Sequence, residues 1–299
     1  MERTLARFLQ GVEEMSGGQI EIELFAGGAL VPVGEQVEAT SQGVIDMSYS
    51  LEGWYAGKVP VSDIASGLPF VFRSNEEARY FMYQRGFLEL LREAYEQFNI
   101  HTIPCDCYDR NFITKDPVYT VDDIDGMKIR GFGAPADLLA KFGASLTNIP
   151  PGETYTALST GVVDGAIAGA VSTAYDLKWH EVTSYLILPE LGRGSTISIL
   201  VNMDVWNEMT PQQQAILEGA AAAYQGVWMS DDHYAFGKIR LEIMRQETGF
   251  SVITLPDEEV DKLQAAAVEI LDGYAQKDAF SAEAVSMVKD YLIELGYIE

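Results

Sequence analysis

Arg130 occupies the position in this chain that most clearly predicts chemistry. Met127-Lys-Ile-Arg130 is expected to be a short strand that runs through Gly131-Phe-Gly133 into a helix over 137–142. A guanidinium at the carboxyl end of a strand, beside a helix N-terminus, outlines an anion site, because the helix dipole favours negative charge there. It could hold a carboxylate through two parallel hydrogen bonds. The alternative is a surface arginine paired with one of the chain's 45 acidic residues.

Other side chains are candidates for contacts with the same ligand. Arg110 follows a strand expected over 100–107, and it could share the acid group with Arg130 or simply neutralise Asp106 or Asp109. The remaining candidates are polar or aromatic residues near the ends of expected elements, where α/β proteins present ligand contacts: Tyr49, Glu52, Trp54, Phe132 and Trp179. A core position is the alternative for each, and above all for the tryptophan at 179, which lies at helical spacing from another aromatic residue.

A dinucleotide site has weak support. Gly131, Gly133 and Ala136 fit the pattern G-x-G-x-x-A. However, Pro135 removes a backbone donor that a pyrophosphate would use, and the acidic residue at the expected distance, Glu153, lies in a first helical turn. The sequence therefore predicts no cofactor.

A metal site and a catalytic site are also weakly supported. His101, Cys105 and Cys107 could form part of a metal site, but a fourth ligand is not evident, and the two cysteines are too close in sequence to favour a disulfide. The sequence has no G-x-S-x-G elbow, P-loop or H-E-x-x-H motif, and its three histidines are scattered. We therefore predict no metal and no enzymatic activity.

An internal repeat indicates two similar α/β lobes. Residues 32–46 return as residues 150–164 with eight of fifteen positions identical. Each copy predicts a short helix, a glycine that ends it and an apolar strand closed by aspartate, and each is preceded by an expected strand, at 19–25 and 127–130. The alternative is chance recurrence of short strings that are common in α/β proteins.

The remaining pattern predicts the elements that connect the lobes. We expect further helices at 1–16, 75–97, 171–185, 257–275 and 281–295, and strands at 100–107, 110–114, 196–202 and 250–255. A capping box at Thr210 opens a helix to about residue 248, whose length of roughly 55 Å exceeds one lobe. The predicted fold is α/β and two-lobed, with a hinge, crossing strands and a long helix spanning both lobes. Lobe I comprises 1–107 plus 196–236, and lobe II comprises 108–195 plus 237–299.

Composition bounds the class of protein. The formal net charge is −25, and phosphate binding needs clustered Lys and Arg, so we predict no nucleic-acid partner. Such acidity is typical of a solvated, self-repelling surface and favours a monomer. No run of about 18 apolar residues is present, so no membrane span is expected.

Several segments, taken together and in order, resemble one known family. They are Ser16-Gly-Gly-Gln-Ile-Glu-Ile22, Gly43-Val-Ile-Asp-Met47, Leu68-Pro-Phe-Val-Phe72, Ile124-Asp-Gly-Met-Lys-Ile-Arg130, the run from Tyr155 to Gly165, and Val201-Asn-x-x-Val-Trp206. With them the sequence resembles the extracytoplasmic solute-binding proteins of TRAP transporters, DctP type.

The resemblance implies a periplasmic-binding-protein-like fold with a cleft between two lobes. It implies that Arg130 binds the carboxylate of the ligand, that Arg110 is a second ligand arginine, and that Glu52 also contacts ligand. Family members often place a polar side chain soon after the Val-Asp-Gly motif, whereas this chain has apolar residues over 166–170. That departure favours an aromatic or branched aliphatic acid over a hydroxylated sugar acid.

A second departure concerns the start of the chain. Members of the family carry a signal peptide and a first strand before the helix at which this sequence begins, and we expect either a late start codon or a truncation. A periplasmic location is therefore implied by the resemblance alone.

The sequence thus predicts a solute-binding protein that captures a small organic acid and delivers it to the membrane subunits of a TRAP transporter. The alternatives are a cytoplasmic α/β enzyme that acts on a carboxylic acid, and a sensor or scaffold that binds the same acid without transport.

Overall fold

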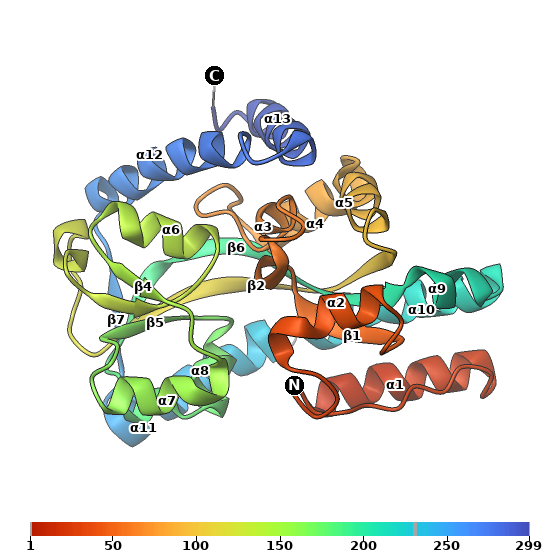
Figure 1. Cartoon of the computed structure of the whole chain (residues 1–299). Coiled ribbons are helices and arrows are strands. Elements are labelled where there is room, and N and C mark those ends of the chain that lie inside the picture. Colours follow the sequence, from red (N-terminus) through yellow and green to blue (C-terminus); the bar gives the residue numbers. More distant parts are fainter. Residues whose placement is uncertain (1, 230–231, 299) are drawn as a thin grey trace.

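A mixed β-sheet of seven strands lies at the centre of the molecule (Figure 1). The computed structural model describes residues 2–229 and 232–298. The strand order is β1-β6-β2-β5-β3-β4, and β7 pairs with β6 off this path. The strands are β1 (Met47–Leu51), β2 (Ile100–Thr114), β3 (Lys128–Arg130), β4 (Ser145–Thr147), β5 (Gly165–Ala168), β6 (Tyr185–Asn202) and β7 (Ser251–Thr254).

The two long strands β2 and β6 connect the two halves of the molecule. They pair antiparallel from Ile100 opposite Asn202 to Thr114 opposite Tyr185. The C-terminal part of β6 pairs with β1 and its N-terminal part with β7, while the C-terminal part of β2 pairs with β5. Register shifts interrupt the β2–β6 pairing on both sides of Arg110. Because such bulges bend a strand, the chain changes direction where the two halves meet.

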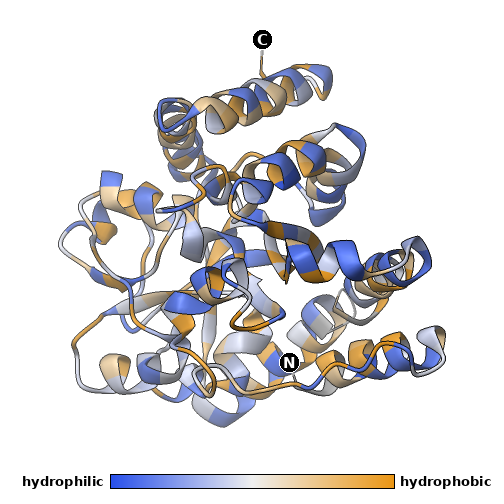
Figure 2. Ribbon diagram, turned by 45° about the vertical axis from the view of Figure 1, so that its right-hand side comes forward, coloured by the Kyte–Doolittle hydropathy of each residue, from blue (hydrophilic) through white to orange (hydrophobic). Residues whose placement is uncertain are grey.

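Helices cover both faces of the sheet. The long helices α12 (Asp257–Tyr274) and α13 (Ala279–Glu294) lie across one side, α12 over α6 and α13 beside α5 (Figure 1). The others are α1 (Glu2–Ser16), α2 (Gln36–Ser41), α3 (Ser62–Ala65), α4 (Asn75–Gln84), α5 (Phe87–Glu96), α6 (Ala134–Lys141), α7 (Pro151–Ser159), α8 (Val171–Asp176), α9 (Met203–Glu208), α10 (Pro211–Ala223) and α11 (Gly237–Thr248). Apolar and polar residues are interleaved along most of them (Figure 2), which is the pattern of helices that cover a core on one side.

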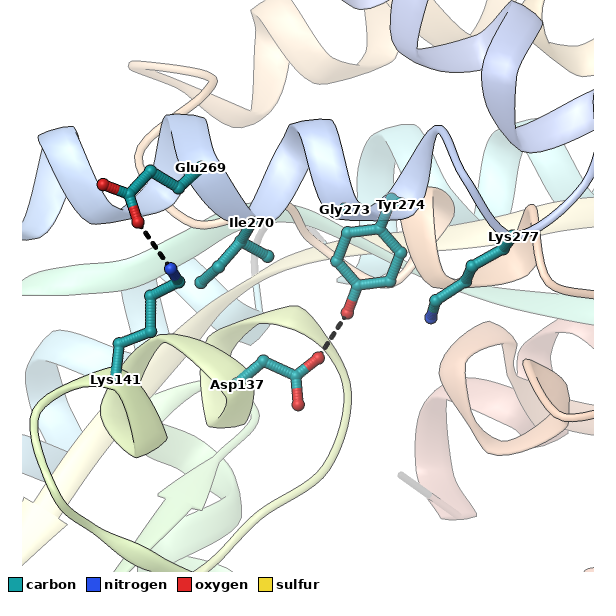
Figure 3. A pocket seen from close by; sticks show the side chains of 7 residues that line it. All are labelled: Asp137, Lys141, Glu269, Ile270, Gly273, Tyr274 and Lys277. Carbon is teal, nitrogen blue, oxygen red and sulfur yellow. Dashed lines mark hydrogen bonds and ion pairs between the residues drawn. The ribbon is translucent and has the colours of Figure 1, made fainter.

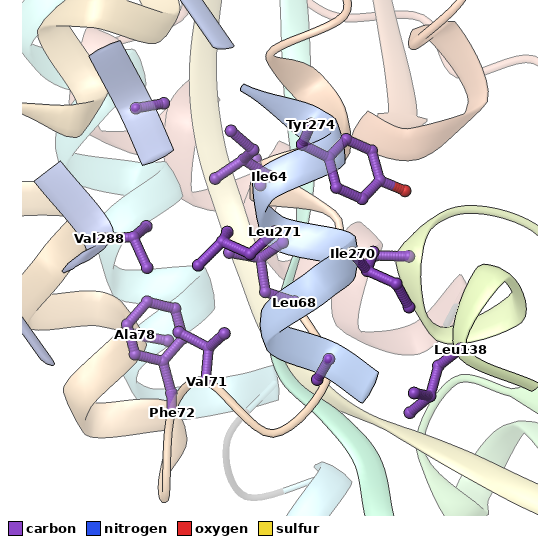
Figure 4. Close-up of a cluster of buried hydrophobic side chains, with 14 of the residues drawn as sticks. Ile64, Leu68, Val71, Phe72, Ala78, Leu138, Ile270, Leu271, Tyr274 and Val288 are labelled. Atoms are coloured by element: carbon purple, nitrogen blue, oxygen red, sulfur yellow. The ribbon is translucent and has the colours of Figure 1, made fainter. Parts of the chain in front are cut away.

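The largest buried cluster extends without a break through both halves. Figure 4 shows side chains of α3, α6, α12 and α13 meeting in it, among them Ile64, Leu138, Leu271 and Val288. Two smaller clusters lie on the other face of the sheet, one under α1 and α10 and one under α7, α8 and α11. The helices α12 and α13 therefore hold both halves through one continuous apolar layer.

The two copies of the repeat have matching local structure. Pro32 and Pro150 precede the helices with nearly the same backbone angles. The helices end at Gly43 and Gly161, both with positive φ, and both glycines donate a backbone hydrogen bond to the residue three positions earlier. The predicted strands are displaced, however, because β1 and β5 begin after the closing aspartate rather than before it. The apolar pair after each glycine completes the helix-ending turn instead.

Several other predicted boundaries differ from the structure. Residues 19–25, predicted as a strand, belong to no strand of the described sheet. Of these residues only Ile20 is buried, and Leu24 and Phe25 face solvent. The helix predicted over 75–97 is divided at Gly86, whose φ of +82° suits a left-handed turn.

Further corrections concern longer elements. The two strands predicted between 100 and 114 are the single strand β2. The helix predicted over 171–185 ends at Asp176 and is followed by the 3₁₀ turn η4 (Trp179–Glu181).

The predicted long helix is α10 and α11 together with the π-helical segments Tyr224–Met229 and Asp232–Phe236 between them. Residues 230 and 231 of that prediction lie outside the described residues. Its two ends lie on opposite sides of the molecule (Figure 1), so this segment follows the sheet from one half to the other.

Candidate ligand-binding site

Arg130 ends the parallel strand β3, and backbone carbonyls hold its side chain. Its Nε donates to the carbonyl of Ile149 at 2.8 Å and its Nη1 to the carbonyl of Ile167 at 3.0 Å. The residue is only 4% exposed, and burial lowers its pKa to about 10, with a further contribution from the nearby charge of Arg110. A side chain at the next position, Gly131, would come within 2.8 Å of Ile167, so glycine permits this close approach.

Arg110 lies on β2 and is 2% exposed. Its Nη2 donates to the carbonyl of Phe132 at 3.4 Å, while its buried Nε has no acceptor among the described residues. The two acids that could have neutralised it have other partners. Asp109 accepts a hydrogen bond from Asn75 at 3.0 Å, and Asp106 bonds His233 at 3.0 Å.

Phe132 lies against both arginines. Its ring centre is 4.7 Å from the guanidinium carbon of Arg110 and 5.5 Å from that of Arg130. Trp54, from the 3₁₀ turn η2 (Glu52–Tyr55), packs on the other side with ring centres 6.0 Å apart. Gly133 follows with φ of +69° and ψ of −172°, a conformation open essentially to glycine alone. The turn from β3 into α6 thus places one aromatic ring over two cations.

Trp179 is a core residue and also a neighbour of Arg130. It is fully buried in the cluster under α7 and α8, as a core residue would be. The guanidinium of Arg130 also lies 5.7 Å from its ring centre, and its indole N–H has no acceptor among the described residues. One side of this core tryptophan therefore borders the arginine pair.

Glu52 is buried, 1% exposed, and is surrounded by hydroxyl groups rather than cations. It accepts hydrogen bonds from Tyr95 at 2.5 Å, from Thr102 at 3.4 Å and from Ser198. Burial raises its pKa to about 7, although the three hydrogen bonds oppose that change. These bonds fix the start of η2, the turn that carries Trp54.

Tyr49 is the predicted contact that the structure does not bring to the arginines. Side chains alternate along β1, so Ser48 and Ser50 are buried on one face and Tyr49 points to the other. There it packs against the cluster that includes Phe8 and Ile103.

Sequence reasoning missed two residues beside Arg110. The amide of Asn111 donates to the carbonyl of Gly169 at 2.8 Å, which ties β2 to the end of β5. The Tyr108 ring would touch a side chain placed at Gly169, and it is buried two positions before Arg110. Period-two spacing on a strand could have indicated Tyr108, but the fold alone brings Gly169 to it.

The site carries two buried positive charges, those of Arg110 and Arg130. Two guanidiniums are buried within contact of one ring, and among the described residues neither forms an ion pair with a carboxylate. Burying an unpaired charge is costly unless a counter-charge occupies the site. The arrangement is therefore suited to a small anion that reaches both arginines.

The structure adds no support for a metal site at His101. His101 stacks on Trp206 with ring centres 3.9 Å apart, and its Nε2 lies 3.4 Å from Glu218. Within residues 2–229 and 232–298, no three His, Cys, Asp or Glu side chains are placed to hold a metal ion.

Two surface hollows lie away from the arginine pair. One of about 330 Å³ lies between α6 and α12, and one of about 510 Å³ lies beside Tyr175 and His180.

No helix in the described part of the chain is both long and apolar enough to cross a bilayer.

Comparison with known proteins gives a consistent result. The profile of the family described as "Bacterial extracellular solute-binding protein, family 7" matches residues 1–278. A monocarboxylate 2-oxoacid-binding periplasmic protein of Nostoc is 24% identical over 271 residues, which cover 90% of this chain and 74% of that protein.

Solved structures share the fold. A TRAP transporter solute-binding protein of Bordetella bronchiseptica, with copurified calcium and picolinate in one site, has a TM-score of 0.91 at 22% identity, covering 99% of this chain and 88% of that one. A TRAP periplasmic solute-binding protein of Pseudoalteromonas atlantica, with bound sodium and pyruvate, has a TM-score of 0.89 at 23% identity, covering 98% and 89%. The predicted two-lobed periplasmic-binding-protein-like fold is confirmed.

Proposed function

We propose a function for this chain from one premise: the chain belongs to the bacterial extracellular solute-binding protein family 7. It captures a small organic acid at Arg110 and Arg130 and delivers it to the membrane subunits of a TRAP-type transporter. The observation that carries the proposal is the pair of buried guanidiniums, which no carboxylate neutralises among the described residues. The carboxylate of the ligand supplies that charge.

The lining of the site supports a ligand with one acid group and an apolar or flat remainder. Beyond the arginines, the surroundings are the rings of Phe132, Trp54 and Trp179 and the apolar strand β5 (Gly165–Ala168). The acids bound in the two solved relatives, picolinate and pyruvate, are small carboxylates of this kind. We therefore propose an aromatic acid, or an aliphatic 2-oxo acid, as the ligand.

Capture takes place by closure of the two lobes. The proposed division follows the sequence analysis, with lobe I formed by 1–107 plus 196–236 and lobe II by 108–195 plus 237–299. Trp54 of lobe I then meets Phe132 of lobe II directly above the arginines. Ligand contacts on both lobes favour the closed form, because a ligand shifts an equilibrium only through its differential affinity.

The remaining parts of the proposal rest on the family. The protein acts in the periplasm, as a monomer, and binds its acid without chemical conversion. The membrane subunits of the transporter are its macromolecular partner, and the surface of net charge −25 keeps it in solution.

Isothermal titration with picolinate, pyruvate and their uncharged amides tests the proposal. We expect binding of an acid but not of its amide, and a loss of about 100-fold in affinity for Arg130→Ala, since hydrogen bonds to a buried charge contribute about 1.5–3 kcal/mol each. Arg85→Ala is the control, because Arg85 pairs with Glu294 at the surface. Retained affinity in Arg130→Ala, or equal binding of acid and amide, contradicts the proposal.

A further inference from the structure

Two side chains, one at the C-terminal end of α12 and one just after it, bond to two helices that adjoin the binding site. Tyr274 donates its hydroxyl to Asp137 of α6 at 2.6 Å, as Figure 3 shows. One helical turn later, Lys277 donates to Asp63 of α3 at 2.7 Å. The same short segment is therefore bonded to α6 and to α3.

The helices α3 and α6 carry the two halves of the aromatic contact over the arginines. Helix α6 begins directly after Phe132, with Gly133 as its N-cap. Helix α3 packs against η2, which carries Trp54, and Ser66 at its end lies 3.1 Å from where a Gly133 side chain would be. Separating Trp54 from Phe132 therefore requires α3 to move away from α6.

The bond to Asp63 is shielded from water on its carboxylate side, whereas the Lys277 side chain is 39% exposed. Asp63 is 5% exposed, and its pKa is raised by burial and by the nearby Asp137, while Lys277 lowers it. If Lys277 moved away, two neighbouring carboxylates would be left without the cation that lies beside them.

The helix α12, which carries Tyr274 and ends three residues before Lys277, is itself firmly packed. Ile270, Leu271 and Tyr274 point from α12 into the large apolar cluster, where Figure 4 shows them beside residues of α3 and α6. The α12 end is thus a fixed support for the two bonds rather than a loose tail.

We propose that the bond Lys277–Asp63 forms a latch, which holds α3 of proposed lobe I to the end of α12 in proposed lobe II and favours the closed form. The bond Tyr274–Asp137 anchors that end to α6 within proposed lobe II. The proposal rests on the proposed function, since a latch on closure presupposes lobes that open. Opening breaks the Lys277–Asp63 bond, so this bond raises the population of the closed form before any ligand arrives.

The same hollow supplies a matched control. Lys141 of α6 pairs with Glu269 of α12 at 2.6 Å, which Figure 3 shows beside the latch. This pair is more exposed and joins α6 to α12 without touching α3. Its loss removes a charge from the same surface but leaves the link between α3 and the end of α12 intact.

The test measures the distance between two spin labels in the ligand-free protein. Val44 and Val162 occupy equivalent positions in the two repeat copies, are 66% and 56% exposed, and lie in different proposed lobes. The labels are introduced as V44C and V162C. The natural Cys105 and Cys107 are shielded, and burial raises the pKa of both thiols, so they react slowly.

We expect Lys277→Met to raise the ratio of the long to the short distance about threefold or more, since a partly shielded charged hydrogen bond contributes on this scale. Tyr274→Phe, whose lost bond lies within proposed lobe II, should leave the ratio unchanged. Lys141→Met should leave the ratio unchanged. If Lys277→Met folds poorly because Asp63 is left unpaired, the double variant with Asp63→Asn gives the same readout without a buried charge.

Unchanged distances in Lys277→Met would overturn the proposal, as would an equal shift in Lys141→Met or Tyr274→Phe. A wild-type protein with no short-distance population would also overturn it, because the closed contact would then be absent in solution. Titration with picolinate and pyruvate separates this outcome from failure of the proposed function. A wild type that binds neither acid but still shows latch-dependent distances supports the latch and contradicts the ligand.

Discussion

The buried carboxyl group of Glu52 should make the stability of the fold depend on pH. Three hydroxyl groups surround its carboxyl group and no cation of the described residues pairs with it, so burial raises its pKa from an ordinary 4.5 to about 7. The folded protein then holds this proton more tightly than the unfolded chain does. Stability falls as pH rises from about 4.5 to 7 and levels off above pH 7. One pKa unit corresponds to about 1.4 kcal/mol, so the ionised form costs the fold roughly 3 kcal/mol.

Glu52→Gln removes this cost while keeping a polar group of the same shape, since the hydroxyls of Tyr95, Thr102 and Ser198 can turn to match an amide. We expect the free energy of unfolding of Glu52→Gln to exceed that of wild type by about 3 kcal/mol at pH 8 and by only about 1 kcal/mol at pH 5. Urea unfolding of both proteins at the two pH values measures it. Comparing a variant with wild type cancels the titration of the other 44 acids.

Glu218→Gln is the control of opposite sign. The neighbouring His101 lowers the pKa of Glu218, with a contribution from Arg92, which donates to it at 2.8 Å, so its stabilisation is present above the ordinary pKa and lost in acid. Glu218→Gln should therefore be less stable than wild type at pH 8 and nearly equal to it at low pH. A Glu52→Gln variant whose difference from wild type does not grow between pH 5 and pH 8 would refute the reasoning.

Four further substitutions test particular contacts by chemical unfolding. Gly43→Ala and Gly161→Ala should each cost about 1 kcal/mol, because both glycines end a helix with positive φ, and equal losses would support the structural equivalence of the two repeat copies. His233→Ala should cost about 3 kcal/mol, since it leaves the carboxylate of Asp106 buried without its partner, and a loss below about 1 kcal/mol would argue against the pair. Gly133→Ala should cost about 1–3 kcal/mol through backbone strain, and a neutral effect would exclude the backbone conformation described for the turn into α6.

Much of the fold was predictable because its local patterns agree with the global arrangement. The capping box at Thr210 is present as expected. The strand positions after each repeat helix were wrong by a few residues, because an apolar pair after glycine serves equally for a strand or for a helix-ending turn. The strand predicted over 19–25 failed because alternation alone cannot show whether a neighbouring strand is present to pair with it.

The candidate site was only partly predictable, for a similar reason. The position of Arg130 followed from local sequence, since a strand end and a helix start lie on either side of it. Whether Arg110 would be neutralised by Asp106 or Asp109 depended on where Asn75 and His233 lie after folding, which no local pattern encodes. The face of β1 on which Tyr49 lies was not predictable, because it depends on the register of the strand, and a shift of one residue reverses it.

The pairing of β1 with β6 has a consequence for the newly made chain. Among the described strands, β1 has β6 as its partner, and Met47 pairs with Val201. An elongating polypeptide thus exposes the edge of β1 until about two-thirds of the sequence has been synthesised. Distant pairings of this kind close slowly and leave apolar segments open to wrong associations in the meantime. A binding chaperone that holds the incomplete polypeptide in an unfolded state should therefore raise the yield of soluble protein more than any change to the finished surface.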